Sequence, residues 1–520
     1  MTYVLLDRNA GPAPGARLYR DPAAIVSATS PQEVASALSR MEALQAEGYH
    51  LAGYFSYELA YALEPRLRPL MPSHRNVPLL WFGAFKAPGM LQPREIEEFL
   101  SQQSGEGFRI DEISPDMARE DYRARFGRAR SYITAGDIYQ LNLTLKARFT
   151  FSGSPAALYR DLRGRQRVEH GALISCESRT ILSLSPELFL EIADGKAITR
   201  PMKGTARRGR TLAEDGAIAR WLAGDEKSRA ENLMITDLMR NDLGRIAEIG
   251  SVRTPALFEV EGYETLHQMT STVEARLRPC IGISDLVHAL FPPGSVTGAP
   301  KVRAIEIIRD LETGPRSVYT GAIGAFTPDG AATFNVAIRT LTIDSAGRGE
   351  IGIGSGVVSD SLADDEYDEC LLKMRFICAP RREFQLIETL RHDPDGSFVL
   401  LERHLDRLAE SAAYFRFACD GSAVRGALAA ESARLGTGEH HRTRLLLFKD
   451  GYITIASVRI DAPDASSPMR YVLSDRHIDS TDSAVFHKTT LRDLYDGEHA
   501  RYAASLGSDE VLFLNERGEL

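Results

Sequence analysis

The 520-residue sequence predicts an α+β fold in which large antiparallel sheets are covered by helices on the outside. Between about residues 140 and 380, runs with strand character dominate, and the helical patterns stand apart from them. The turn sequence Thr327-Pro328-Asp329-Gly330 separates two of these runs and predicts a hairpin, which requires antiparallel pairing. A smaller α+β segment is expected to follow and to run to the last residue.

The chain is too long for one hydrophobic core, so several domains are expected. The polar stretch 101–107 predicts a linker after an N-terminal α+β part, residues 1–103. The second part is expected at 108–379. The sequence Ala379-Pro380-Arg381-Arg382 marks the start of the third part, residues 381–520.

The individual elements follow from the spacing of apolar residues. A helix is predicted around residues 122–133, with Gly136 as its C-terminal stop. The alternation over residues 139–146 predicts a half-buried strand. Further strand-like runs cover residues 182–192, 197–205, 318–326, 333–343 and 350–358, and further helices cover 228–241, 299–311 and 362–376.

One predicted helix carries a glutamate on its apolar face. Over residues 228–241 the apolar stripe is Met234, Ile235 and Leu238, and Glu231 lies on that stripe. A carboxylate on a buried face must be paired, protonated or bound to a cation.

The helix after Leu362 shows the same feature. Its stripe is Leu362, Leu372 and Phe376, and Glu366 and Glu369 fall on it. Glutamates from two helices, without a Cys or His cluster, are hard oxygen ligands suited to Mg²⁺. Ordinary buried salt bridges are the alternative, and the periodicity leaves both open.

Three further stretches are chemically suggestive. The loop 294–301 leads into a helix with Thr297 as the expected N-cap and backbone N–H groups available to an anion. The run Gly352-Ile353-Gly354-Ser355-Gly356 allows the backbone to approach a ligand closely. Glu187 follows a run of small and apolar residues, and its burial would raise its pKa as a general acid requires. Each stretch alone also fits a purely structural role.

Bulk properties exclude several classes of function. The net charge of −9 provides no basic footprint for nucleic acid and no polybasic membrane patch. The longest apolar stretch, residues 79–85, is too short to span a bilayer, and the N-terminal residues lack signal-peptide character. Five scattered cysteines argue against disulfides and zinc and favour a reducing, cytoplasmic location.

Read in order, these stretches resemble the chorismate-utilising enzymes, a family that includes the component I subunits of anthranilate synthase and aminodeoxychorismate synthase. The resemblance covers residues 1–378. It is carried by Gly136-Asp137-Ile138-Tyr139-Gln140-Leu141-Asn142-Leu143, Ser185-Pro186-Glu187, Arg200-Pro201-Met202-Lys203-Gly204-Thr205, Arg229-Ala230-Glu231-Asn232-Leu233-Met234, Asp237-Leu238-Met239-Arg240-Asn241-Asp242-Leu243, Thr297-Gly298-Ala299-Pro300-Lys301, Arg339, the glycine run and Glu366-Tyr367-Asp368-Glu369.

The resemblance implies a site for chorismate and Mg²⁺. Glu231 and Glu369 would ligate the metal, with Glu366 nearby, and the metal would neutralise the ring carboxylate. The enolpyruvyl carboxylate would be held by Tyr319, Arg339 and the backbone at Gly354, Ser355 and Gly356. The ring pocket would be lined by Gly204 and Thr205, with Thr297 also binding substrate. Glu187 would protonate the leaving hydroxyl, with His267 assisting.

Lys203 separates the branches of the family. Anthranilate synthases carry an apolar residue at this position, whereas aminodeoxychorismate synthases carry a lysine that attacks C2 of the ring. Ammonia then attacks C4 and expels the lysine. A desolvated lysine has a lowered pKa and can act as a nucleophile. The resemblance therefore implies aminodeoxychorismate synthase component I, an enzyme of p-aminobenzoate and folate biosynthesis, with anthranilate synthase component I as the alternative.

The sequence contains no Gly-x-Cys-x-Gly nucleophile elbow of a glutaminase. Ammonia is therefore expected from a separate glutamine amidotransferase subunit. An alternative of a different class is a non-catalytic subunit that only binds such an amidotransferase. The acidic residues and Lys203 argue against it, since a scaffold does not need buried carboxylates.

In the last segment, four stretches carry a second resemblance: residues 384–390, 400–408, 442–447 and 487–490. They are similar to the N-terminal part of aminodeoxychorismate lyase, a class IV aminotransferase-like enzyme that uses pyridoxal phosphate (PLP). Arg407 would contact the cofactor phosphate and Lys488 would hold the cofactor covalently. The family's glutamate partner for the pyridine nitrogen would follow Leu520. We therefore expect either a longer natural chain, in which the synthase is fused to a complete lyase domain, or a degenerate appendage. PLP is expected only in a complete domain, and no lyase step is expected from these 520 residues.

Overall fold

The computed structural model describes residues 2–11, 13–105, 107–176, 178–263, 266–378, 383–462 and 468–520. The chain forms two compact units. The first contains residues 1–205, 222–263 and 267–381, and the second contains 206–221, 264–266 and 382–520. The boundary predicted between residues 379 and 381 lies outside the described residues.

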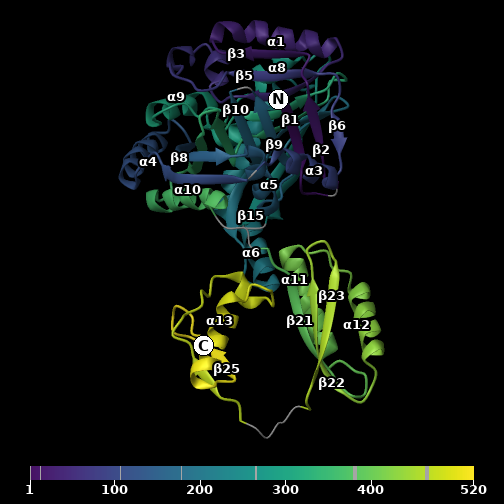
Figure 1. Ribbon diagram of the computed structural model, residues 1–520. Helices are drawn as coiled ribbons and strands as arrows, with labels where there is room; N and C mark the ends of the chain where they lie inside the picture. Colours follow the sequence, from purple (N-terminus) through teal and green to yellow (C-terminus); the bar gives the residue numbers. More distant parts are fainter. Residues whose placement is uncertain are drawn as a thin grey trace. The chain divides into compact units, whose positions relative to one another are not determined.

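Two large antiparallel sheets build the first unit (Figure 1). Within the described residues, one contains ten strands: β1 Tyr3–Arg8, β2 Gly15–Arg20, β6 Gly89–Leu91, β7 Phe108–Pro115, β8 Gln140–Gly153, β9 His170–Cys176, β10 Arg179–Ser185, β16 Gly298–Ala299, β19 Thr340–Asp344 and β20 Arg348–Val357. The other, counted over the same residues, also contains ten: β3 Ala24–Ala28, β4 His50–Phe55, β5 Leu80–Phe85, β11 Leu188–Ala193, β12 Lys196–Thr199, β13 Met202–Arg207, β14 Arg253–Gly262, β15 Leu266–Arg276, β17 Ala322–Phe326 and β18 Ala332–Val336.

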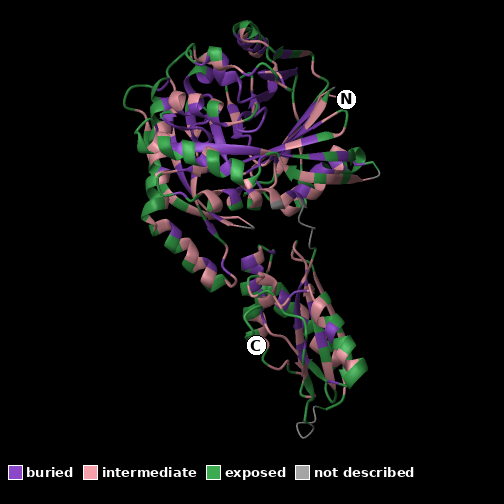
Figure 2. Cartoon of the chain, turned by 90° about the vertical axis from the view of Figure 1, so that its left-hand side faces the viewer, coloured by how far each residue is buried: buried purple, intermediate pink, exposed green. Residues whose placement is uncertain are grey.

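The two sheets share a core and carry helices on their outer faces. Val4 and Tyr19 of the first sheet pack with Tyr54 and Trp81 of the second. Figure 2 shows many of these strands as buried. The helices of this unit are α1 Pro31–Ala46, α2 Leu59–Leu63, α3 Pro93–Gln103, α4 Arg119–Thr134, α5 Pro155–Arg165, α7 Glu226–Gly244, α8 Ile283–Leu290, α9 Lys301–Leu311 and α10 Ala363–Cys378, with 3-10 turns η1 Arg68–Leu70 and η2 Gly294–Val296. The predicted α+β class with outer helices is confirmed.

The second unit is smaller and also mixes helices with strands. Its three-stranded sheet contains β21 Leu386–His392, β22 His440–Leu447 and β23 Ile453–Ile460, and its two-stranded parallel sheet contains β24 Tyr471–Leu473 and β25 Glu510–Leu512. Its helices are most of α6 Leu212–Gly224, then α11 Leu401–Phe415, α12 Gly421–Leu435, α13 Asp493–Leu506 and the 3-10 turn η3 Ser483–Phe486. Leu386, Leu408, Leu428 and Leu445 form the centre of its core.

Two predicted strand runs change sheet part-way. The run 182–192 divides into β10 of one sheet and β11 of the other, and the run 333–343 divides into β18 and β19 in the same manner. Ser185 Oγ donates to the carbonyl of Val336 at 2.6 Å, so the two crossovers lie side by side. Glu187 lies in the first crossover and Arg339 in the second.

Three local predictions require correction. The N-cap expected at Thr297 is wrong, because α9 begins at Lys301 with Pro300 as its N-cap, and Thr297 Oγ1 donates to the carbonyl of Gly294 at 3.1 Å. The apolar stripe on α10 is also wrong, because Leu362 and Leu372 are 61% and 58% exposed. The strand predicted as half-buried at 139–146 is buried on both faces from residue 140 to 145.

Candidate active site

Glu187 is held in the crossover between the two sheets. Its backbone carbonyl accepts from Val336 N at 3.0 Å, and its N–H donates to Ser185 Oγ at 3.2 Å. The side chain is 4% exposed. Burial raises the pKa of its carboxyl to about 7, against the lowering effects of Ser295, Lys203 and the Met202 backbone. The carboxyl can therefore hold a proton near neutral pH.

Lys203 enters the same region from β13. The next residue, Gly204, has φ +93°, and a Cβ added there would lie 2.9 Å from Ser228 Cβ on α7. A glycine is required for this close approach of strand and helix. Asn232 Nδ2 on α7 donates to the Lys203 carbonyl at 3.2 Å, which fixes the backbone of the lysine against the helix that carries Glu231.

The Lys203 ammonium is desolvated and surrounded by mixed charge. Burial lowers its pKa, and the neighbouring Lys373 lowers it further, while Glu231, Glu187 and Glu369 oppose the shift. Among the described residues, no carboxylate forms an ion pair with it. A buried amine in this setting loses its proton more easily than a solvated lysine does, and the neutral form is the nucleophile.

Gly356 of β20 faces Lys203. A Cβ added at Gly356 would lie 3.0 Å from Lys203 Nζ and 2.8 Å from Gln140 Nε2. A Cβ at Gly352 would overlap the Tyr319 ring at 2.0 Å. Ser355 lies between them on the strand and points to the other face, where its hydroxyl is 3.1 Å from that of Tyr122. The side of β20 next to Lys203 is therefore bare backbone.

Three glutamates from α7 and α10 are electrostatically coupled. Burial raises the pKa of Glu231, and repulsion from Glu366 and Glu369 raises it further. Burial would also raise the pKa of Glu369, but Lys373, Lys203 and Lys227 lower it overall. Lys373 Nζ is 2.6 Å from Glu369 Oε1, and Ser361 Oγ donates to Glu366 at 2.7 Å.

The donor chemistry of these carboxylates fits a divalent cation, because their oxygens are hard ligands and a bound cation would offset the repulsion between their negative charges. In the part of the chain that the structure describes, no group of three His, Cys, Asp or Glu side chains is already arranged around a metal position. Cationic and hydroxyl partners satisfy Glu369 and Glu366 instead.

Arg339 is a partly buried cation with φ +49° in the second crossover. Burial lowers the pKa of its guanidinium, and Tyr263 acts in the opposite direction. Within the described residues no carboxylate pairs with it. A desolvated guanidinium without a carboxylate partner is a strong site for an anion, particularly for a carboxylate that matches its fork.

The remaining predicted residues lie at different depths. Thr205 is exposed, Thr297 is fully buried, and His267 is 4% exposed on β15. Sequence reasoning missed Lys373 and Gln140. Lys373 stands four residues after Glu369 and also donates to the Gly354 carbonyl at 2.8 Å, and that spacing was the available signal. Gln140 carried no signal, because its polar side of β8 was expected to face solvent.

The second unit holds another charged group. Arg407 donates to the buried Glu388 through Nε at 2.8 Å and Nη2 at 2.6 Å, and His404 Nδ1 lies 2.7 Å from the same carboxylate. Burial lowers the pKa of Lys488, while Glu388 opposes the shift and Arg407 and other arginines add to it. A lysine with a lowered pKa beside several guanidinium groups fits an aldehyde-bearing phosphate such as PLP.

The described part of the chain contains no helix that combines the length and the apolar character needed to cross a membrane.

The fold defines the class: an α+β protein of two large antiparallel sheets that carries a buried Glu187 and partly buried Lys203 and Arg339. Residues 2–379 match the family described as chorismate binding enzyme, and the chain belongs to that family. Residues 385–520 match the family described as amino-transferase class IV.

The chorismate-binding region also matches individual proteins. It is 46% identical over 263 residues to aminodeoxychorismate synthase of Streptomyces pristinaespiralis, covering 50% of this chain and 36% of that protein. It is 43% identical over 264 residues to aminodeoxychorismate synthase component 1 of Klebsiella aerogenes, covering 50% and 58%. These matches thus span less than two thirds of the relatives. Anthranilate synthase component I from Streptococcus pneumoniae TIGR4 has a similar structure, with a TM-score of 0.60 at 25% identity, covering 71% of this chain and 93% of that one.

Proposed function

We propose that this protein is an aminodeoxychorismate synthase component I, which converts chorismate and ammonia to 4-amino-4-deoxychorismate. The observation that carries the proposal is the partly buried Lys203, which has a lowered pKa and no carboxylate ion pair among the described residues, close to a Glu187 whose pKa is about 7. The names of the similar proteins from Streptomyces and Klebsiella support the same activity.

The chemistry assigns a nucleophile and an acid. Neutral Lys203 would attack C2 of the ring while Glu187 transfers its proton to the departing C4 hydroxyl, with both ring double bonds shifting. Ammonia would then attack C4 while the bond from C2 to Lys203 breaks, which restores the double bonds and the free amine. Each step forms one bond to nitrogen and breaks one bond at the ring.

The substrate carboxylates would be bound by opposite means. Arg339 would donate hydrogen bonds to the enolpyruvyl carboxylate, beside the backbone of Gly354 and Gly356 and the Tyr319 ring. Glu231, Glu366 and Glu369 would hold Mg²⁺, which when bound neutralises the ring carboxylate. Thr205, Thr297 and His267 are proposed to complete the pocket. Ammonia would come from a glutamine amidotransferase partner.

We further propose that residues 1–379 carry the synthase part, with a boundary near residues 103–108, and that residues 381–520 are a lyase-like part. In the lyase-like part Lys488 would hold PLP covalently and Arg407 would contact its phosphate. The Arg407 guanidinium is oriented by Glu388, so its outer edge would remain available for the phosphate.

The test is to incubate the protein with chorismate, Mg²⁺ and ammonium and to identify the product by mass spectrometry. We expect aminodeoxychorismate from the unmodified protein and none from Lys203→Ala, in which any remaining turnover would yield anthranilate by direct attack of ammonia at C2. Lys196→Ala, at an exposed lysine of β12, is the control. Anthranilate as the main product of the unmodified protein would contradict the proposal.

A further inference from the structure

Residues 206–221 lie in the chain between Lys203 and Glu231, yet they belong to the second unit rather than the first. We call this stretch the docking segment. It begins within β13, three residues after Lys203, and ends five residues before α7 begins at Glu226. β13, which carries Lys203, therefore continues directly into it, and α7, which carries Glu231, follows after residues 222–225.

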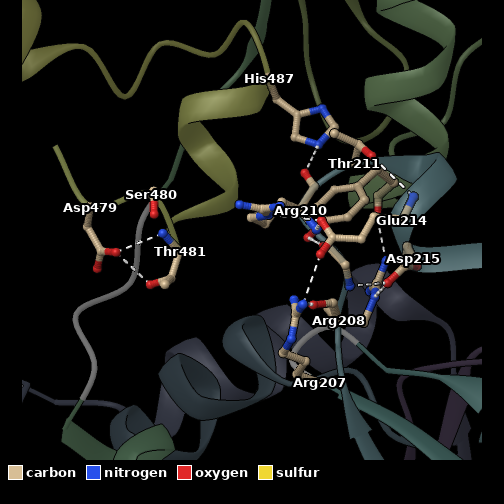
Figure 3. Close-up of polar contacts among 12 residues, drawn as sticks. Arg207, Arg208, Arg210, Thr211, Glu214, Asp215, Asp479, Ser480, Thr481 and His487 are labelled. Carbon is tan, nitrogen blue, oxygen red and sulfur yellow. Dashed lines mark hydrogen bonds and ion pairs between the residues drawn. The ribbon is translucent and has the colours of Figure 1, made fainter. Parts of the chain in front are cut away.

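Ion pairs and hydrogen bonds within the docking segment hold its turn in one conformation (Figure 3). Arg208 donates to Asp215 through Nε at 2.7 Å and Nη2 at 2.8 Å, and both side chains are nearly buried, at 11% and 10% exposure. Gly209 N donates to the same carboxylate at 2.8 Å, and a Cβ at Gly209 would lie 2.1 Å from the Asp215 nitrogen. Glu214 accepts from Arg207 and Arg210, so the turn before α6 is fixed by ion pairs.

The C-terminal residues present a surface that matches this turn. Tyr414 on α11 is buried, and its hydroxyl donates to the Gly209 carbonyl at 2.6 Å. His487 Nε2 is 3.1 Å from the Arg210 carbonyl, and the His487 ring stacks on Tyr414 with centroids 4.4 Å apart. The Arg208 guanidinium also lies over the Tyr414 ring, 4.8 Å from its centroid.

The hydrogen bonds fix the state of His487. Because Nε2 faces a carbonyl, it must carry the proton, and Nδ1 then accepts from Ser411 Oγ at 3.0 Å. The groups facing the ring are Tyr414, Phe415, Ser411 and the Arg210 backbone, with the Arg210 guanidinium over the adjacent Phe486. The Tyr414 hydroxyl and both ring nitrogens of His487 therefore have partners, as a specific docking surface requires.

We propose that Tyr414 and His487 are a docking surface for residues 206–221, and that this internal contact positions the two chain segments carrying Lys203 and Glu231. His487 also precedes Lys488, so the loop that carries Lys488 is tied to the same segment. The inference does not depend on which reaction the first unit performs.

Hydrogen–deuterium exchange and amine labelling of the full-length protein test this proposal. In Tyr414→Phe, which removes only the hydroxyl, exchange in peptides of residues 206–221 should rise about twofold to tenfold, the factor expected for one hydrogen bond. In the double variant Tyr414→Leu/His487→Ala the rise should be larger and extend into residues 200–205, and the labelling rate of Lys203 should change. Exchange in β4 and β5 should remain unchanged.

Arg425→Ala is the matched control, because it breaks an exposed ion pair with Glu402 in the same unit. It should alter neither exchange in 206–221 nor labelling of Lys203. If exchange in 206–221 is unchanged in both variants, the docking surface is wrong. If it rises while exchange in 200–205 and labelling of Lys203 stay unchanged, the positioning role is wrong. Should the double variant unfold generally, Tyr414→Phe decides by the same two readouts.

Discussion

At the scale of single residues, burial acts in opposite directions on the two groups that would do the chemistry. It raises the pKa of Glu187 toward neutrality and lowers that of Lys203. Each group is thereby moved toward its uncharged form, the protonated acid and the free amine. These are the forms that the proposed displacement at the ring requires.

The first prediction concerns Glu187. Since its pKa is about 7, kcat/KM for chorismate should fall about tenfold per pH unit above that value, as the acid loses its proton. Glu187→Gln should lower kcat by about 10²- to 10⁴-fold and abolish this limb of the profile. Initial rates between pH 6 and 9 are the measurement. A Gln variant that keeps both its rate and the same limb would disprove the acid role.

The same pKa has a consequence for stability. A carboxyl whose folded pKa lies above its unfolded value contributes stability below the unfolded pKa, and that contribution is lost as pH rises through about 7. The burial of Glu187 therefore lowers the free energy of unfolding most at alkaline pH.

At the scale of elements, the close approach of β13 to α7 depends on one glycine. Gly204→Ala should destabilise the fold by about 1–2 kcal/mol through its left-handed φ alone, with a further cost from the contact with Ser228. Gly195→Ala is the matched control, because Gly195 has φ +71° and open space around it. The midpoint temperature of thermal unfolding and the rate of chorismate turnover should both fall more for Gly204→Ala than for Gly195→Ala. Equal effects of the two substitutions would refute the contact.

The acidic pair on α7 and α10 gives another prediction. Glu231→Gln or Glu369→Gln should raise the Mg²⁺ concentration needed for half-maximal turnover, because each removes one carboxylate from the proposed ligand set. Glu226→Gln, an exposed residue on α7, should behave as the unmodified protein does. Titration with Mg²⁺ at fixed chorismate measures the effect. Unaltered Mg²⁺ dependence in both variants would show that the metal is held elsewhere.

Several elements could be predicted from the sequence and several could not. The helix 228–241 and the hairpin at Thr327 followed from periodicity and turn chemistry, and both are present in the structure. The sheet crossovers at Glu187 and Arg339 were not predicted, because each lies inside one uninterrupted run of residues with strand character. The α10 stripe failed because Leu362 and Leu372 face outward while Tyr367, Cys370 and Ile377 form the buried side.

The polar side of β8 shows why part of the site was missed. Gln140, Asn142 and Thr144 alternate with leucines, a pattern typical of a solvated face. They are buried instead, with Thr144 bonded to Glu312 and Gln140 next to Gly356. Alternation distinguishes the two faces of a strand, but a site lining and a solvated face have the same composition.

At the scale of the whole molecule, the source of nitrogen is testable. The sequence lacks a glutaminase elbow, so glutamine alone should give no aminodeoxychorismate, whereas ammonium, or glutamine with an amidotransferase subunit, should. Product formation by the purified protein under each condition is the measurement. Turnover on glutamine without a partner subunit would reveal a hydrolytic site that the proposal omits.

The assignment of residues 206–221 to the second unit bears on how the gene can be divided. A split at a single point near residue 380 would appear to separate two independent proteins. The N-terminal product would still carry Arg208, Gly209 and Arg210, while Tyr414 and His487 would be left on the other product. The C-terminal product would then lack residues 206–221 of its own folded unit, and the N-terminal product would carry them without their partners, so the gene cannot be divided cleanly at one point.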